Sequence, residues 1–226
     1  MATAGASYDF DGTGDHLSYG DISVFDGMAP FTFAFWLNLD STAANQGISG
    51  KYVSYAAHHF YIMIGGNNKI EMSVRDGSGN ATYDAITVTT EIGTGAWHHI
   101  AVNYNVSRGA TDRWQSFLDG VVKTTSAVAD NAAGGFPTTS EAFVVGDLDI
   151  WATFPLDGRI AYFQGYDKVL SQDEVKEIMY KPFSIPGNNL FNAPLYDTNA
   201  TDVVGGLTAT AAGDAAIIVE GPPVFL

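Results

Sequence analysis

Apolar side chains occupy every second position in several stretches of this chain. The clearest stretch is 31–39, FTFAFWLNL, which places three phenylalanines and two leucines on one face. Successive side chains of a strand point to opposite faces, so this alternation predicts a strand with one face in a core. Similar alternation predicts strands at 70–75 and 99–104. Shorter apolar runs predict further strands at 61–64, 85–90, 142–146 and 159–163.

Tight-turn dipeptides separate these runs. Asp119-Gly120 lies between the runs 115–118 and 121–124, and Asp-Gly tolerates the positive φ that a type I′ hairpin turn requires. The same dipeptide occurs at 11–12, 26–27, 76–77 and 157–158. Strands separated by turns about every ten residues indicate an antiparallel β-sandwich rather than alternating strands and helices.

One helix is predicted, at 172–180. Ser171 and Glu174 have the spacing of a capping box, in which each side chain bonds the backbone N–H of the other residue. Apolar residues then recur at helical spacing, and Pro182 ends the helix.

The composition changes after residue 181. Residues 182–226 are rich in Gly, Ala, Thr and Asn, and they contain two strand candidates, at 190–196 and 215–220. We therefore divide the chain into a domain over 1–181 and a C-terminal tail over 182–226. We expect the tail to pack on the sandwich or on a neighbouring chain.

Charge and apolar run length exclude several classes of partner. The 226 residues include 25 acidic and 10 basic ones, for a net charge of −15. This field repels phosphate backbones and anionic membrane surfaces, which excludes nucleic acid as a partner. No stretch approaches the ~18 apolar residues of a membrane span, so membrane insertion is excluded as well. The opening residues lack the pattern of a signal peptide, so we expect a protein made in a host cytoplasm or one whose leader has been removed.

Seven segments follow one another in an order and spacing that resemble the laminin-G-like, concanavalin A-like jelly rolls. The resemblance covers residues 6–181 and implies an all-β sandwich of two antiparallel sheets with one short helix near 172–180. The segments are YDFDGTGDHL (8–17), FTFAFWL (31–37), WHHIAVNY (97–104), FLDG (117–120), VG (145–146), LDGRI (156–160) and LSQDEVKEIMY (170–180).

The resemblance leaves the function open, because members of this family include lectins, adhesion modules, enzyme appendages and virion surface proteins. The tail, with APLYD at 193–197 and GPPV at 221–224, resembles tails of such domains in phage structural proteins. We therefore expect a phage virion surface protein, a capsid decoration or fibre protein that contacts capsid or tail proteins, its own copies and host glycans. The alternative is a soluble, extracellular carbohydrate-binding lectin or enzyme-associated module that depends on calcium.

The sequence predicts no catalytic residue. Glucanases on this fold carry Glu-x-Asp-x-x-Glu on one strand, and none of the six glutamates has that spacing. The strained turn Gly-x-Ser-x-Gly of serine hydrolases is absent too. Histidines 58–59 and 98–99 are adjacent, so on a strand each pair would point to opposite faces and could not chelate one ion. His98 is expected to be a core-edge residue satisfied by a backbone bond. A hydrolase with carboxylates from different strands stays a third possibility.

Calcium is the candidate cofactor that the family resemblance implies. Rim loops of this fold class hold calcium with aspartate and carbonyl oxygens, and Asp11, Asp15 and Asp157 occupy the positions most similar to those loops. The carboxylate that the family carries after its Gly-x-Ile segment is replaced here by Ala161. Asp-Gly turns also form without an ion, because the aspartate caps its own turn.

Aromatic side chains on loops are the candidates for contact with sugars. Trp151, Trp114 and Tyr55 are assigned to loops, where their rings could stack on a sugar face. Trp36 and Trp97 lie in core-type segments and are expected to be structural.

Overall fold

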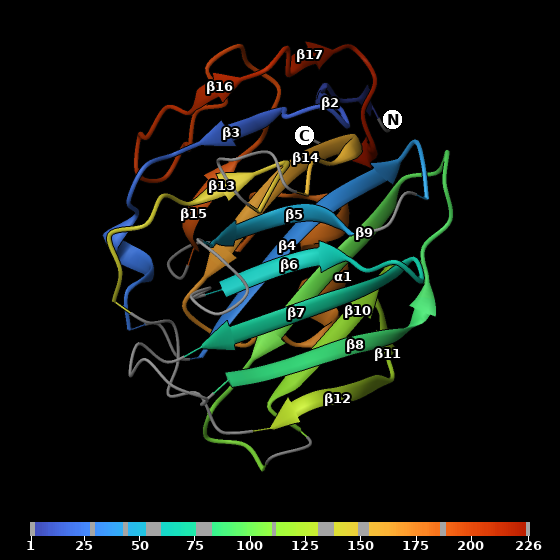
Figure 1. Cartoon of the computed structure of the whole chain (residues 1–226), viewed down its shortest axis with the longest axis vertical. Coiled ribbons are helices and arrows are strands. Elements are labelled where there is room, and N and C mark those ends of the chain that lie inside the picture. The colour runs from blue at the N-terminus through green and yellow to red at the C-terminus, as the bar shows by residue number, and fades with distance from the viewer. Residues whose placement is uncertain are drawn as a thin grey trace.

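Two antiparallel sheets pack face to face in the computed structural model (Figure 1). The structure describes residues 3–27, 30–42, 45–52, 60–75, 83–109, 112–130, 138–148, 154–185 and 189–224. Within these ranges each sheet has eight strands, and a small third sheet pairs β1 (Thr3–Ala4) with β18 (Pro223–Val224). The architecture confirms the predicted two-sheet antiparallel jelly-roll sandwich.

We call the sheet nearer the viewer in Figure 1 the front sheet and the other one the back sheet. The order of the front sheet is β12 (Thr125–Asp130), β8 (Tyr83–Glu91), β7 (Lys69–Arg75), β6 (Phe60–Ile64), β5 (Gln46–Lys51), β13 (Val144–Val145), β3 (His16–Ser18) and β16 (Thr210–Ala212). The order of the back sheet is β11 (Val121–Lys123), β10 (Trp114–Leu118), β9 (His98–Tyr104), β4 (Phe31–Leu39), β14 (Asp157–Tyr166), β2 (Ser7–Asp11) and β17 (Ala216–Ile218), and β15 (Asn189–Ala193) also pairs with β14.

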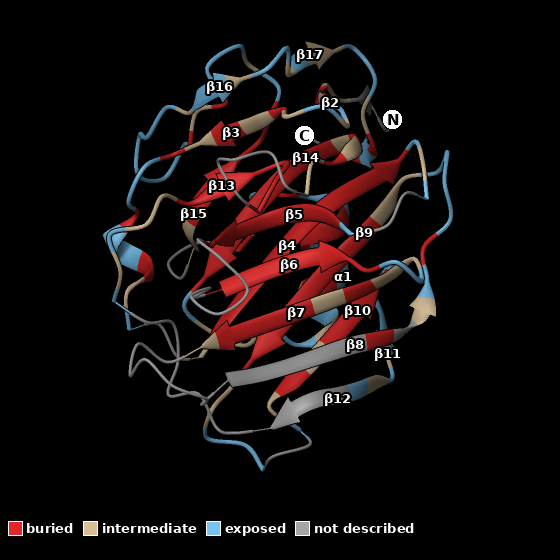
Figure 2. Cartoon of the chain, viewed as in Figure 1, coloured by how far each residue is buried: buried red, intermediate tan, exposed pale blue. Residues whose placement is uncertain are grey.

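The core lies between the sheets and is rich in aromatic rings. The predicted alternation of β4 is confirmed, since Phe31, Phe33 and Phe35 are fully buried against the front sheet. The rings of Phe33 and Phe60 lie 4.8 Å apart, which joins the two sheets directly. Figure 2 shows that buried residues occupy the central strands of both sheets. Burial of each such ring contributes roughly 1.5–3 kcal/mol to folding.

The opposite face of β4 is buried as well, because α1 (Gln172–Tyr180) covers the back sheet. The indole N–H of Trp36 donates to the carbonyl of Met179 at 3.1 Å, at the end of the helix. At the other end, the amide of Asn103 donates to the carbonyl of Leu170 at 2.8 Å. The helix bounds and the capping box of Ser171 are as the sequence predicts.

The hairpin between β10 and β11 turns at Asp119 and Gly120, whose φ angles of 53° and 71° confirm the predicted type I′ turn. The Asp119 carboxylate also accepts the backbone N–H of His99 at 2.9 Å and lies 2.9 Å from Nδ1 of His98. The expectation that His98 is satisfied by a backbone bond is therefore wrong, because the partner of its ring is a carboxylate.

Residues 189–224 add strands to both sheets. Two of these strands, β15 and β17, coincide with the predicted strands at 190–196 and 215–220, and β16 and β18 were not predicted. Phe191, Ala193 and Leu195 are fully buried in the main core.

We expect the buried His99 to make the fold sensitive to acid. Burial lowers the pKa of His99 from its ordinary value of 6.5 to about 3, and the charge of Asp119 opposes this shift. Above pH 6.5 the ring is neutral in the folded and the unfolded chain, whereas below it the unfolded chain takes up the proton first. The free energy of unfolding should fall by up to about 1.4 kcal/mol per pH unit as the pH decreases below that value.

Urea unfolding of the wild type and of His99→Gln, from about pH 7 to about pH 4, measures this contribution. The variant should lose that part of the pH slope, whatever its stability at neutral pH. Glutamine takes up no proton in this pH range, so the difference between the two slopes isolates the contribution of His99. Equal slopes for His99→Gln and the wild type would contradict the prediction.

Candidate functional site

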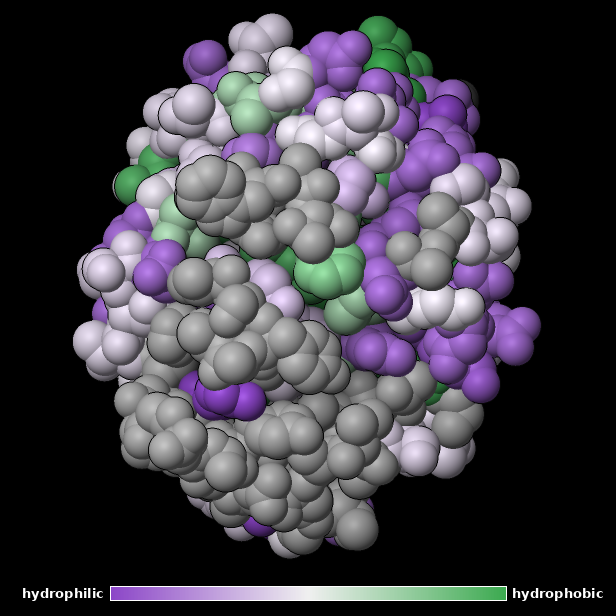
Figure 3. Space-filling view, viewed as in Figure 1, coloured by the Kyte–Doolittle hydropathy of each residue, from purple (hydrophilic) through white to green (hydrophobic). Residues whose placement is uncertain are grey.

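A hollow of about 240 Å³ lies on the outer face of the front sheet, above β5, β6 and β7. Its rings belong to Tyr52, Tyr61 and Phe154, and we call it the aromatic hollow. Tyr52 meets Tyr61 at a centroid distance of 6.1 Å and Phe154 also at 6.1 Å, with interplanar angles of 79° and 84°. Figure 3 shows apolar surface near the middle of this face. The remaining lining residues are Asn45, Met63, Glu71 and Leu148.

Strand alternation explains which side chains reach the hollow. On β6, Phe60, Ile62 and Ile64 point into the core, so Tyr61 and Met63 point to the outer face. The neighbouring strand β7 places Glu71 opposite Met63. The floor of the hollow is thus set by two paired strands of the front sheet.

Asp147 and Gly47 hold the other wall of the hollow in place. One carboxylate oxygen of the buried Asp147 accepts the backbone N–H of Leu148 at 2.6 Å and that of Phe154 at 3.2 Å. The N–H of Gly47 donates to the carbonyl of Phe154 at 2.7 Å. A Cβ at position 47 would lie 2.5 Å from the backbone nitrogen of Leu148, so only glycine lets this segment cross β5 so closely.

Glu71 is the carboxylate of the hollow. Its burial beside the apolar wall raises the pKa of its side chain. It lies against Gly65, where an added Cβ would come 2.5 Å from its Oε1. Asn45 stands exposed at the rim. The hollow therefore offers ring faces on one side and an acceptor and an amide on the other.

The described lining of the hollow contains one carboxylate, that of Glu71. Glycoside hydrolysis by the usual mechanisms needs two carboxyl groups that flank the scissile bond. This part of the structure therefore offers binding groups and does not offer that catalytic pair.

Two of the three predicted ligand-binding aromatics, Tyr55 and Trp151, lie outside the described residues. Tyr52 and Phe154, which border 53–59 and 149–153 in the sequence, are described and line the hollow. Sequence reasoning missed Tyr61, Phe154 and Glu71 as site residues, although the alternation on β6 gave a signal for Tyr61.

The assignment of Trp114 to a loop is wrong. Trp114 is the first residue of β10 and is 5% exposed, because it packs into the core. Its ring lies 4.7 Å from that of Tyr104 and 6.2 Å from that of Phe31. The predicted run begins at 115, whereas β10 begins one residue earlier, at Trp114.

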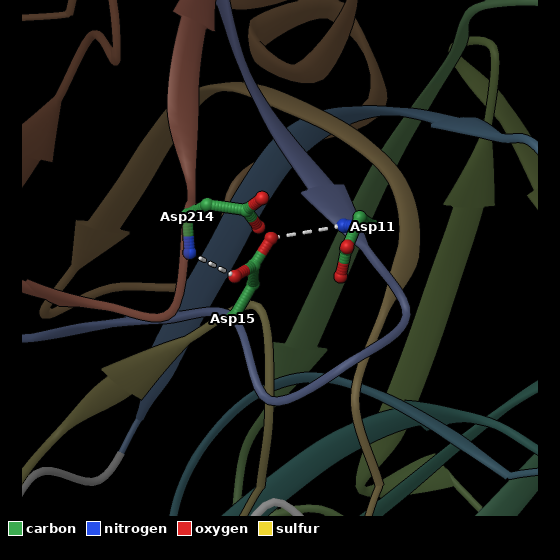
Figure 4. A group of neighbouring side chains, drawn as sticks. All are labelled: Asp11, Asp15 and Asp214. Carbon is green, nitrogen blue, oxygen red and sulfur yellow. Dashed lines mark hydrogen bonds between the residues drawn. The ribbon is translucent and has the colours of Figure 1, made fainter.

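Three aspartates gather where β2 ends and β16 turns into β17 (Figure 4). Carboxylate oxygens of Asp11, Asp15 and Asp214 all lie within 4.8 Å of one another. The buried Asp15 accepts the backbone N–H of Asp11 at 3.0 Å with one oxygen and that of Asp214 at 2.7 Å with the other. The charges of Asp11 and then Asp15 raise the pKa of the Asp214 carboxyl.

The structure thus brings together Asp11 and Asp15 of the predicted calcium residues and adds Asp214 to them. Asp157 pairs with Asp11 across β14 and β2 but lies outside the carboxylate group. Asp214 could not be identified locally, since the pairing of β16 with β3 brings it across 199 residues of sequence.

None of the helices in the described part of the chain is long and apolar enough to cross a membrane.

Comparison with known proteins places the fold. Among curated proteins, human neuronal pentraxin-2 is 29% identical over 189 residues, which cover 78% of this chain and 38% of the pentraxin. The chain therefore spans less than two fifths of that relative. A solved candidate carbohydrate-binding protein from Bacteroides ovatus has a TM-score of 0.72 and 18% identity, covering 99% of this chain and 62% of that one.

Two further solved structures share the fold. A heptameric SAP-like pentraxin from Limulus polyphemus has a TM-score of 0.61 and 14% identity, over 95% of this chain and 94% of the pentraxin. The carbohydrate-binding module CBM40 of the IT-sialidase from Ruminococcus gnavus has a TM-score of 0.55 and 16% identity, over 79% of this chain and 95% of the module.

A family model settles the classification that the sequence segments suggested. The model described as the concanavalin A-like lectin/glucanases superfamily, of laminin G type, matches residues 11–176, which is more than half of the chain. With its two-sheet sandwich and this match, the chain belongs to the concanavalin A-like lectin/glucanase superfamily.

Proposed function

We propose that this chain is a carbohydrate-binding protein and that the aromatic hollow holds the sugar. The observation that carries the proposal is the meeting of three rings with Glu71 and Asn45 in one concavity. Sugars present C–H faces that pack on aromatic rings and hydroxyl groups that bond to carboxylates and amides. The B. ovatus and R. gnavus structures, whose names state carbohydrate binding, support this reading.

The size and charge of the hollow limit the kind of sugar that can bind there. A volume of about 240 Å³ is below the ~300–1,000 Å³ of sites for drug-sized ligands, so the hollow suits one sugar unit. The Glu71 carboxylate repels a negative group inside the hollow. We therefore infer a neutral unit, whose hydroxyl groups donate to Glu71.

Calcium binding by Asp11, Asp15 and Asp214 is a second proposal, which the family resemblance motivates. The oxygen separations of up to 4.8 Å fit ligands around one calcium ion, whose Ca–O distances are ~2.3–2.6 Å. Each oxygen of Asp15 accepts one backbone bond and keeps a second lone pair. The mutual repulsion that raises the pKa of Asp214 is the interaction that a cation would relieve.

A place on a virion surface stays a prediction of the sequence. It requires contacts with capsid or tail proteins, or among copies of this chain. Incorporation of the protein into purified particles would support it, and a stable monomer absent from such particles would contradict it.

Glycan binding should depend on Tyr52 and Glu71. Calorimetry with neutral oligosaccharides selected on a glycan array should show a loss of affinity of about tenfold or more for Tyr52→Ala. Glu71→Gln should weaken binding by a similar factor, because a hydrogen bond to a charged acceptor is lost. Tyr196→Ala, an exposed tyrosine outside the hollow, is the control and should bind as the wild type does.

Tyr52→Phe separates stacking from folding, since it keeps the ring and should retain most of the affinity. Thermal unfolding of each variant checks that the sandwich is intact. Failure of the wild type to bind any glycan on a broad array, with and without calcium, would contradict the proposed function.

The aspartate group gives a separate prediction. Asp214→Asn should raise the melting temperature slightly at neutral pH, because it removes a charge that Asp11 and Asp15 repel. This gain should shrink as the pH falls through the raised pKa of Asp214, where the wild type takes up the proton itself. Millimolar calcium should raise the melting temperature of the wild type more than that of the variant.

Asp112→Asn removes an exposed carboxylate outside the group and serves as the control for charge alone. An equal response of the wild type and Asp214→Asn to calcium would rule out this group as the calcium site.

A further inference from the structure

A second concavity, of about 590 Å³, lies at the end of the sandwich where β11 and β12 belong to different sheets. The chain leaves the back sheet at Lys123 and enters the front sheet at Thr125. The loop that precedes β10 forms the other wall. Charged and polar side chains dominate the lining, which includes Arg108, Asp112, Trp114, Gln115, Lys123 and Thr124. We call this concavity the basic groove.

The groove collects positive charge in a chain that has little of it. Arg108 and Lys123 are two of only 10 basic residues. Asp112 is the one carboxylate in the described lining, so the net charge of the lining is positive. At physiological ionic strength the Debye length is about 8 Å, so the many distant acidic groups are largely screened. The local charges therefore determine the electrostatic potential in the groove.

Neither Arg108 nor Lys123 has an ion-pair partner among the described residues, as is also the case for Lys69, Lys176 and Lys181. Lys51 is paired with Asp21 at 2.7 Å, Arg159 with Asp9 at 3.1 Å and Lys168 with Glu174 at 2.5 Å. Those pairs stabilise the fold, whereas the charges of the groove serve no such internal contact.

The floor of the groove is rigid. Trp114 is fixed by Tyr104 and Phe31 in the core, and Gln115 belongs to the same paired strand. Strand pairing fixes the backbone of Gln115 and of Lys123, which pairs with Ser116 across β10 and β11, and this lowers the entropy lost on binding.

We propose that the basic groove binds the carboxylate of an acidic saccharide. An arginine can hold a carboxylate with two parallel N–H···O bonds, and a lysine adds a point charge. The assignment of the carboxylate to a saccharide rests on the proposed function, while the groove itself is separate from the aromatic hollow. The hollow takes a neutral unit and the groove an acidic one, so the two sites divide the ligand by charge.

The test compares acid and ester forms of the same saccharides by calorimetry. The probes are oligogalacturonate and sialyllactose, each with its methyl ester, which removes the negative charge and little else. We expect the wild type to bind at least one acid about tenfold more tightly than its ester, since a charge-assisted bond is lost. The double variant Arg108→Ala/Lys123→Ala should bind the acid about tenfold or more weakly than the wild type does, and its affinity for neutral glycans should be unchanged.

Lys176→Ala/Lys181→Ala is the matched control, because both lysines are exposed and the net charge changes equally. Tyr52→Ala should lose binding of the neutral glycan and keep binding of the acid. A wrong proposal for the basic groove can therefore be distinguished from a wrong proposal for the aromatic hollow. Wild-type affinity of the Arg108→Ala/Lys123→Ala variant for the acid would overturn the proposal. Equal binding of acid and ester, or no binding of either acid, would overturn it too.

Discussion

The burial of β4 on both faces is the constraint on which the rest of the structure depends. Its phenylalanines fill the space between the sheets, and its Thr32, Ala34 and Trp36 are covered from behind. A strand with two buried faces needs two covers, and here they are the front sheet and α1. Removal of either cover would expose apolar surface, so the helix is part of the core although it lies outside the sandwich.

Local patterns of sequence predicted those parts of the fold that local chemistry decides. The alternation of 31–39, the Asp119-Gly120 turn and the Ser171 capping box were each predicted and found, because each depends on residues within a few positions. The edge strands β16 and β18 were missed, since they have few apolar side chains and exist through pairing with distant strands. Trp114 was misplaced for the same reason, because packing with Tyr104 across strands decides its burial.

The candidate sites could be predicted only in part. Asp11 and Asp15 are near each other in sequence, and a resemblance could identify them, whereas Asp214 joins them only through the fold. The aromatic hollow needs two loops, one side of a sheet and the close approach that Gly47 permits. Composition indicated an acidic protein that repels anionic partners, and the basic groove shows that ten cations can still be distributed unevenly.

The pairing of β17 with β2 and of β16 with β3 has a consequence for how the chain is made. Both contacts join the first twenty residues to a segment about 200 residues later, as the bond between Asp15 and Asp214 illustrates. Closure of so long a loop is slow, because its entropy must be lost before the contacts form. During synthesis β2 and β3 therefore present open edges until residues 210–218 have left the ribosome. Completion of the sandwich on this side is therefore a late step in the folding of the chain.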